Sequence, residues 1–257
     1  MRDGESMRLA GKHAVVTGGA TGIGEALALG VARAGATVGV LDKNGAGAER
    51  TAEAIRAAGG RAVALTCDIT RYDQVEAALA EVLRHFTPIH ILVANAGGSQ
   101  GQTRSFLDLT LAEWHEMVDR NLTGAFYCGH VFARHMAANG GGAIVFTSSQ
   151  LSETARPGLV HYASAKGGVR QLVKGMAVDL ARYEIRVNAI APGPTLTPGN
   201  REMFERPEYR EANLRTIPLG RIGRPEEMVG AVVYLASDEA SFTTGTTIFV
   251  DGGYVIV

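Results

Sequence analysis

The sequence predicts an α/β protein with a doubly wound, seven-stranded parallel sheet and helices on both faces. Alanine-rich segments of helical length, such as 24–35, 47–59 and 73–86, alternate with short runs of β-branched residues. Near-continuous apolar runs of strand length are typical of strands that are buried on both faces of a parallel sheet. Right-handed crossover connections then place helices on both sides of that sheet. The runs span residues 13–17, 37–41, 61–66, 89–95, 142–148, 185–191 and 246–250.

Residues that begin and end helices agree with this alternation. Gly35 and Gly59 stand where two of the helices should end. Thr110 and Glu113 have the spacing of a capping box, which predicts that a long helix begins there. The run NGGG at 139–142 predicts a turn before the fifth strand.

No linker, repeat or low-complexity segment interrupts the alternation, so we expect a single domain over residues 1–257. One stretch departs from the pattern. Residues from about 194 to 217, between the sixth strand and the last helix, are rich in Pro, Arg and Glu. Long insertions in compact domains are usually lids or binding loops. We therefore expect a substrate lid at about 194–217.

The composition is that of an ordinary globular chain. Lys and Arg number 25 against 26 Asp and Glu, and no basic stripe indicates a nucleic-acid partner. Cys67 and Cys128 are the only cysteines, and each is expected to be a small buried apolar residue. No apolar run approaches the ~20 residues that span a bilayer, and the first residues do not resemble a signal peptide. We expect no membrane association and a cytoplasmic location.

A glycine-rich turn, TGGATGIG at 17–24, follows the first predicted strand. Gly18, Gly22 and Gly24 allow a sharp turn and a close approach to a ligand, and the turn, which includes Thr21 and Ile23, leads into a helix N-terminus that favours anions. The spacing differs from the usual G-x-G-x-x-G fingerprint of dinucleotide sites. The position between strand and helix nevertheless predicts a dinucleotide site. Glycines that serve turn geometry alone are the alternative.

Asp42 ends the second predicted strand, about 20 residues after the turn, where a carboxylate binds the adenosine ribose hydroxyls in dinucleotide sites. The same carboxylate would repel a 2′-phosphate by roughly 1–4 kcal/mol. Lys43 is adjacent and partly offsets this repulsion. The pair favours NAD as cofactor, with NADP less favoured. The alternative role of Asp42 is to cap the following helix.

Tyr162 and Lys166 are four residues apart, so they share one face of a predicted helix. A nearby ammonium and an oxidised nicotinamide ring would favour the phenolate, and lowering the phenol pKa by about three units needs roughly 4 kcal/mol. The tyrosine could then exchange a proton with an alcohol or a carbonyl. Ser149, at the end of the fifth strand, could hold the substrate oxygen. An ordinary surface pair is the alternative for Tyr162 and Lys166.

The order and spacing of several motifs resemble the short-chain dehydrogenase/reductase family, in the branch of the 3-oxoacyl reductases and sugar dehydrogenases. The resemblance runs from about residue 8 to the end of the chain. It implies a Rossmann-like fold that binds NAD(P) and usually forms homotetramers, although the sequence leaves dimer and tetramer open. The motifs are TGGATGIG (17–24), ANAG (94–97), SS (148–149), YASAK (162–166), PGP (192–194) and the closing segment 218–253.

The resemblance also implies roles for four residues. Tyr162 corresponds to the acid–base, Ser149 to the residue that polarises the reacting oxygen, and Lys166 to the lysine that lowers the tyrosine pKa and binds the nicotinamide ribose. Asn121 corresponds to the asparagine whose backbone kink holds a proton-relay water near the lysine. The alternative for Asn121 is a buried polar residue that joins two segments.

By the same resemblance, further residues are expected to contact the cofactor. The carboxylate after the third strand should meet the adenine, and the chain after the sixth strand should run along the nicotinamide. The family often has an aliphatic residue where this chain has Thr195, which leaves the carboxamide contact open. The expected contacts are Asp68, Ile69, Asn95, Ala96, Gly97, Ile190, Pro192, Gly193, Thr195 and Thr197.

Loops decide the substrate in a fold of this kind. Segments 97–104 and 150–161 and the lid should line the pocket, with Ser149, Gln150, Arg156 and His161 as candidate substrate contacts. Arg156 or Arg104 could pair with a substrate carboxylate. The alternatives are solvated loop charges for the arginines and a packing role for His161.

These observations favour an NAD-dependent enzyme that interconverts a secondary alcohol and a ketone on a small polar substrate, such as a sugar, sugar acid or polyol. No metal site is expected. One alternative is an NADPH-dependent 3-oxoacyl-[acyl-carrier-protein] reductase, which would need a basic patch and a cationic residue near Ala20 and Thr21. Another is a catalytically silent NAD-binding scaffold or sensor. Such a protein usually lacks the tyrosine or the lysine.

Overall fold

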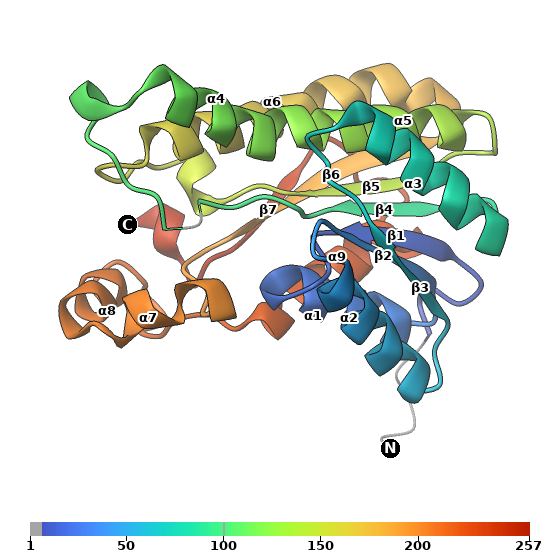
Figure 1. The fold of residues 1–257 in the computed structure, drawn as a ribbon, viewed down its shortest axis with the longest axis horizontal. Helices are drawn as coiled ribbons and strands as arrows, with labels where there is room; N and C mark the ends of the chain where they lie inside the picture. The colour runs from blue at the N-terminus through green and yellow to red at the C-terminus, as the bar shows by residue number, and fades with distance from the viewer. Residues whose placement is uncertain (1–6, 100) are drawn as a thin grey trace.

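A computed structural model describes residues 7–99 and 101–257. Within them, seven parallel strands form one sheet in the order β3-β2-β1-β4-β5-β6-β7 (Figure 1). The predicted fold class is confirmed, and each strand lies within two or three residues of its predicted run. The strands are β1 (His13–Thr17), β2 (Thr37–Asp42), β3 (Ala62–Thr66), β4 (Ile91–Ala94), β5 (Gly142–Thr147), β6 (Ile185–Pro192) and β7 (Thr247–Val250).

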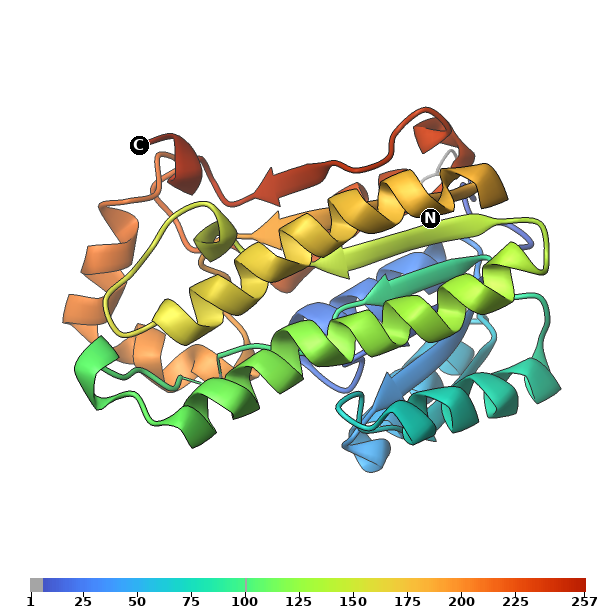
Figure 2. The same ribbon diagram turned by 90° about the horizontal axis from the view of Figure 1, so that it is seen from above.

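Helices cover both faces of this sheet. One face carries α3, α5 and α6, which lie side by side in Figure 2, and the other carries α1, α2 and α9. Two short helices, α7 and α8, lie beyond the end of the sheet in Figure 1. The helices are α1 (Gly22–Arg33), α2 (Gly45–Ala57), α3 (Tyr72–His85), α4 (Leu111–Val118), α5 (Gly124–Ala137), α6 (Val160–Leu180), α7 (Arg201–Glu205), α8 (Pro207–Leu214) and α9 (Val229–Ala236).

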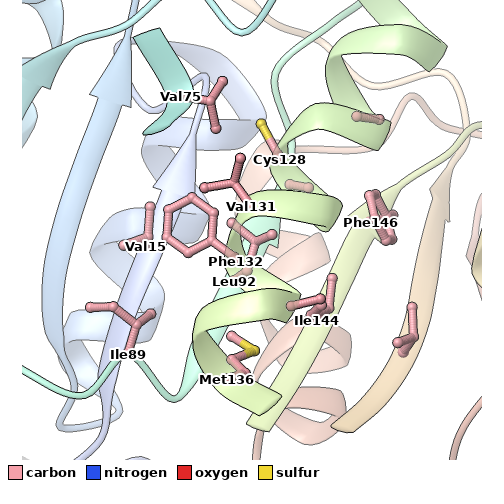
Figure 3. Close-up of a cluster of buried hydrophobic side chains, with 14 of the residues drawn as sticks. Val15, Val75, Ile89, Leu92, Cys128, Val131, Phe132, Met136, Ile144 and Phe146 are labelled. Carbon is pink, nitrogen blue, oxygen red and sulfur yellow. The ribbon is translucent and has the colours of Figure 1, made fainter. Parts of the chain in front are cut away.

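Successive strand residues pack alternately into two separate hydrophobic cores, one on each face of the sheet. Val15 packs with Leu92 and Phe132 on the face of α5 (Figure 3), whereas its neighbours Ala14 and Val16 pack on the opposite face. Successive side chains of a strand point to opposite faces, so the consecutive apolar residues Ala14, Val15 and Val16 of β1 are buried on both sides of the sheet. This burial explains why the strands are near-continuous apolar runs in the sequence.

The long helix that was expected after Thr110 is present, and a π-helical turn interrupts its middle. The capping box is present, because Thr110 and Glu113 exchange hydrogen bonds between side chain and backbone. However, α4 ends at Val118 and a π-helical turn, Asp119–Thr123, separates it from α5. Such turns are frequently found at functional sites. Here the turn carries Asn121.

The expected lid forms its own short helices, α7 and α8, preceded by a single 3₁₀ turn at Pro198–Asn200. Cys67 and Cys128 are buried free thiols, as expected. No helix within the described residues is long and apolar enough to cross a membrane.

Candidate active site

A cavity of about 840 Å³ opens at the carboxyl ends of the strands. β1 lies between β2 and β4, so the chain order reverses at this point of the sheet, which is where open α/β sheets bind their ligands. Most of the predicted site residues line this one cavity. They are Gly18, Thr21, Gly22, Ile23, Gly24, Asp42, Lys43, Asp68, Ile69, Asn95, Ala96, Gly97, Ser149, Gln150, Arg156, Tyr162, Lys166, Pro192, Gly193, Thr195 and Thr197.

The glycine-rich turn forms a tight cradle at the N-terminus of α1. Gly18 and Gly22 have φ values of 68° and 60°, which favour glycine. A Cβ on Gly18 would lie 2.7 Å from the Ala96 Cα, and a Cβ on Gly24 would overlap the Gly18 carbonyl oxygen. Asn95 donates through its Nδ2 to the Gly18 carbonyl oxygen over 3.3 Å. The glycines therefore allow the turn to pack closely against Ala96 and against the start of α1. The N-terminus of α1 faces the cavity, as a phosphate site should.

Asp42 joins the end of β2 to this turn. One carboxylate oxygen accepts from the Ala20 N–H at 3.1 Å and the other from the Asn44 N–H at 2.8 Å. The cap of α2 is Asn44, whose side chain accepts from the Gly47 N–H at 3.1 Å. Asn44, and not Asp42, is therefore the residue that caps α2. The Asp42 carboxylate is held at the edge of the cavity, beside the glycine-rich turn.

Tyr162 and Lys166 lie one turn apart on α6. The Lys166 Nζ is 5.9 Å from the centre of the Tyr162 ring and donates to the Thr147 carbonyl oxygen at 2.9 Å. Lys166 is 3% exposed, and this burial lowers the pKa of its ammonium to about 8. The pair is therefore an internal one at the cavity wall, and the alternative of a solvated surface pair is wrong.

The pKa of the Tyr162 phenol is raised, whereas the sequence predicted that it would be lowered. Burial raises this pKa, and hydrogen bonding with the Ser149 hydroxyl only partly opposes the rise. We expected Lys166 to lower the phenol pKa, but desolvation of a phenolate outweighs an ammonium that is not in direct contact with the oxygen. The protein's own groups thus keep Tyr162 protonated at neutral pH.

Ser149 is oriented by its neighbours at the end of β5. Its hydroxyl donates to the Gln150 Oε1 at 2.9 Å and accepts from the Leu151 N–H at 3.1 Å. Ser149 is 5% exposed and Gln150 is 7% exposed, so both side chains are positioned before any substrate arrives. A buried hydroxyl held in this way can polarise an oxygen that takes the place of the Gln150 acceptor.

Asn121 lies behind the cavity wall. Its Oδ1 accepts from the Gly98 N–H at 2.7 Å, and its Nδ2 donates to the Met117 carbonyl oxygen at 3.0 Å. The side chain joins the π-helical turn to the loop after β4, which is the alternative role considered for it. A Cβ on Gly97 would lie 2.7 Å from the Asn121 Oδ1 and 3.4 Å from the Lys166 Nζ. The Asn121 Oδ1 and the Lys166 Nζ therefore both lie close to Gly97.

The candidate substrate residues separate into two groups. Gln150 and Arg156 line the cavity, whereas His161 is outside its lining, is 1% exposed and has no hydrogen-bond partner for either ring nitrogen within the described residues. This placement agrees with a packing role for His161. Arg104 also lies outside the lining and pairs with Glu113 at 2.7 Å.

The sequence did not single out the lid residues that line the cavity. Met203, Phe204, Tyr209 and Asn213 reach it from α7 and α8. Tyr209 and Asn213 are four residues apart and so share a helix face, but Met203 and Phe204 are adjacent, and helices of five and eight residues are too short for a clear periodic pattern. Arg120 of the π-helical turn also lines the cavity.

Comparisons with known proteins agree with this geometry. A family model described as enoyl-(acyl carrier protein) reductase matches residues 18–255. Gluconate 5-dehydrogenase of Gluconobacter oxydans is 37% identical over 249 residues, covering 96% of each chain. The structure of a gluconate 5-dehydrogenase from Burkholderia cenocepacia in complex with NADP and tartrate has a TM-score of 0.93 at 38% identity, with 98% of each chain covered. A 7α-hydroxysteroid dehydrogenase complexed with NADH and 7-oxo glycochenodeoxycholic acid has a TM-score of 0.92 at 35% identity, with 98% of each covered.

The doubly wound sheet, the glycine cradle at its switch point and the pairing of Tyr162 with the buried Lys166 define a dinucleotide-dependent enzyme of the dehydrogenase class. The chain belongs to the short-chain dehydrogenase/reductase family. It is an NAD(P)-dependent oxidoreductase that acts on CH–OH groups and interconverts alcohols and ketones.

Proposed function

We propose that the protein is an NAD-dependent dehydrogenase that interconverts a secondary alcohol and a ketone on a small polar compound, such as a sugar, sugar acid or polyol. The observation that carries the proposal is the meeting of Ser149, Tyr162 and Lys166 in the same cavity as the glycine cradle. The cradle suits a cofactor pyrophosphate, because the glycine-rich turn leads into the N-terminus of α1, and Gly18, Gly22 and Gly24 line the cavity there.

Each residue of the site has a defined task in this reaction. When bound, the nicotinamide ring supplies the hydride acceptor for oxidation and the hydride donor for reduction. Ser149 donates a hydrogen bond to the reacting oxygen of the substrate. The Tyr162 oxygen takes the hydroxyl proton as the alcohol becomes a ketone, and it returns the proton to the carbonyl oxygen in the reverse reaction. Lys166 favours the phenolate and binds the nicotinamide ribose, and Asn121 holds a proton-relay water near Lys166.

Asp42 supports NAD as the preferred cofactor. The carboxylate lies at the end of β2, where the adenosine ribose is expected, and it would repel a 2′-phosphate. Lys43 lines the cavity beside it and reduces this repulsion. One similar structure contains NADP and another NADH, so both forms occur among similar proteins.

Two alternatives are less well supported. A 3-oxoacyl-[acyl-carrier-protein] reductase would need a cation near Ala20 and Thr21, and the Ala20 N–H instead binds the Asp42 carboxylate. A silent scaffold would not need the buried ammonium beside the phenol, which costs folding free energy because burial lowers the Lys166 pKa.

The protein is also proposed to be a cytoplasmic homotetramer. Exposed apolar side chains support association, since Leu107 is 91% exposed, and Ile256 and Val257, at the apolar C-terminus, are 80% and 79% exposed. Size-exclusion chromatography with light scattering distinguishes a tetramer from a dimer.

The proposed function is tested by following nicotinamide absorbance with NAD and with NADP against sugars, sugar acids, polyols, hydroxy acids and apolar alcohols. Turnover of a polar class with NAD is the expected result. Activity with NADP and acyl or apolar substrates alone would contradict the proposal, and it would show that Lys43 outweighs Asp42 in choosing the cofactor.

A further inference from the structure

Arg156 is a cation at the substrate end of the cavity whose charge is not neutralised. Within residues 7–99 and 101–257, no carboxylate lies within 4.0 Å of its nitrogens. Two other arginines of the nearby loops and helices have such partners, because Arg104 pairs with Glu113 and Arg170 pairs with Glu153. Arg156 is therefore the better of the two arginines that the sequence offered for a substrate anion.

The lid holds the Arg156 guanidinium in place. Its Nη1 donates to the Asn213 Oδ1 at 2.8 Å, and its central carbon lies 5.6 Å from the centre of the Tyr209 ring. Asn213 is fully buried, and its Nδ2 donates to the Tyr209 carbonyl oxygen at 2.7 Å, which fixes the orientation of its amide. The Tyr209 ring in turn packs edge-on against the Phe204 ring, with 5.2 Å between the ring centres. A guanidinium held from one side keeps its other N–H groups available to a ligand.

Within the described residues, no acidic side chain from segment 147–166 or from the lid lines the cavity beside Arg156. Among the lining residues of 147–166 and of the lid, the charged side chains in the described part of the chain are Arg156 and Lys166. Lys166 is buried and bonded to the Thr147 carbonyl oxygen, so it is already engaged. The acidic lining residues lie elsewhere, at the ends of β2 and β3 and on α4 and the π-helical turn, and each has partners of its own. They are Asp42, Asp68, Glu116 and Asp119.

We propose that Arg156 binds a carboxylate of the substrate, so that the enzyme acts on small hydroxy acids and their keto acids, such as sugar acids, in preference to neutral sugars and polyols. This inference rests on the proposed function, because it assigns the substrate class of the same site. A carboxylate is favoured over a phosphate because one guanidinium balances one negative charge and matches the planar carboxylate with two parallel hydrogen bonds.

The test compares each acid with the neutral compound of the same carbon skeleton. Gluconate is paired with sorbitol, and galactonate with galactitol, and kcat/KM is measured for wild type, Arg156→Gln, Arg156→Lys and the control Arg104→Gln. Wild type should prefer the acids. Arg156→Gln should lower kcat/KM for the acids by roughly 10- to 100-fold, mostly through KM, because a charged hydrogen bond is lost. The neutral compounds should change less than about 3-fold. Arg156→Lys should retain part of the preference, and Arg104→Gln should retain all of it.

Equal losses for acids and neutral compounds in Arg156→Gln would overturn the inference, because they would indicate that Arg156 only supports the lid. A preference for neutral or phosphorylated sugars in wild type would also overturn it. Calorimetric titration of the protein with gluconate in the presence of NADH separates the two proposals. If no alcohol is oxidised with either cofactor, the proposed function fails, whereas gluconate binding that is lost in Arg156→Gln would still support the anion site. If gluconate does not bind to wild type, the anion site fails.

Discussion

The Lys166 ammonium lies 5.9 Å from the centre of the Tyr162 ring, and the Thr147 carbonyl oxygen holds it at 2.9 Å. The carbonyl keeps the positive charge beside the phenol, although burial makes that charge costly and lowers the Lys166 pKa to about 8. Burial also raises the Tyr162 pKa. Burial therefore disfavours the charged form of each residue, the ammonium of Lys166 and the phenolate of Tyr162. An oxidised nicotinamide ring nearby would favour the phenolate.

Replacing Tyr162 with phenylalanine should remove turnover and leave cofactor binding intact. The change deletes one oxygen and keeps the buried ring, so kcat should fall by about 10²- to 10⁴-fold, the usual contribution of a general acid–base. Steady-state kinetics and a fluorescence titration with NADH measure the two quantities. Tyr183→Phe, on the partly exposed ring of Tyr183, is the control. Unchanged kcat in Tyr162→Phe would exclude this tyrosine as the proton carrier.

Replacing Asp42 with asparagine should shift the cofactor preference toward NADP. The neutral amide removes repulsion of a 2′-phosphate worth roughly 1–4 kcal/mol, so the ratio of kcat/KM for NAD to that for NADP should fall by about 5-fold or more. Lys43→Ala should change the ratio in the opposite direction, because it removes the cation that reduces the repulsion. Kinetics with both cofactors at a fixed substrate concentration provide the ratio. If the ratio is the same in wild type and both variants, another residue selects the cofactor.

Strand positions and the cofactor cavity could be predicted because their causes are local. A strand buried on both faces must be apolar at nearly every position, and the glycine-rich turn and Asp42 lie next to the strands that place them. The long helix after Thr110 could be predicted from its capping box, but the π-helical turn within it could not, since contacts of Asn121 with Gly98, a residue 23 positions away, hold that turn.

The properties of individual site residues depended more on tertiary packing. The Tyr162 pKa rises because the folded chain shields the phenol from water, and a spacing of four residues contains no measure of that desolvation. Arg104 and Arg156 looked equivalent in the sequence. Glu113, which belongs to the capping box of α4, pairs with Arg104, whereas Arg156 meets the neutral amide of Asn213. The partner of Arg104 is nine residues away, but that of Arg156 is 57 residues away, on a helix whose position the sequence does not reveal.

Gly24 and Gly230 are both helical glycines, yet alanine should have opposite effects at the two positions. A Cβ on Gly24 would overlap the Gly18 carbonyl oxygen and lie 2.5 Å from the Asn95 Nδ2, so Gly24→Ala should destabilise the fold by about 1–3 kcal/mol and weaken NADH binding. A Cβ on Gly230 in α9 would meet nothing within 4 Å, so Gly230→Ala should stabilise by about 0.5–1 kcal/mol. Urea unfolding measures both, and a neutral Gly24→Ala would mean that the cradle adapts readily.

Two histidines at the amino ends of the strands accept hydrogen bonds from the backbone. The His90 Nδ1 accepts from the His13 N–H at 2.9 Å, and the His135 Nε2 accepts from the Ile89 N–H at 3.0 Å. Burial lowers the pKa of both imidazoles, and His13, Lys12 and His135 lower that of His90 further. Protonation of either accepting nitrogen would break its hydrogen bond and add a cation to this cluster.

The folded protein should therefore lose stability in mild acid. With folded-state pKa values below the ordinary 6.5, the unfolded chain binds protons more readily, so the free energy of unfolding falls as the pH drops below about 6.5. Thermal unfolding between pH 5 and 8 should show this fall in wild type. In His90→Asn combined with His135→Gln, the fall should be smaller, because each amide oxygen replaces the accepting nitrogen and cannot be protonated in this range. His85→Gln, on the exposed surface of α3, should behave as wild type. An equal decline in all three proteins would assign the acid sensitivity to other groups.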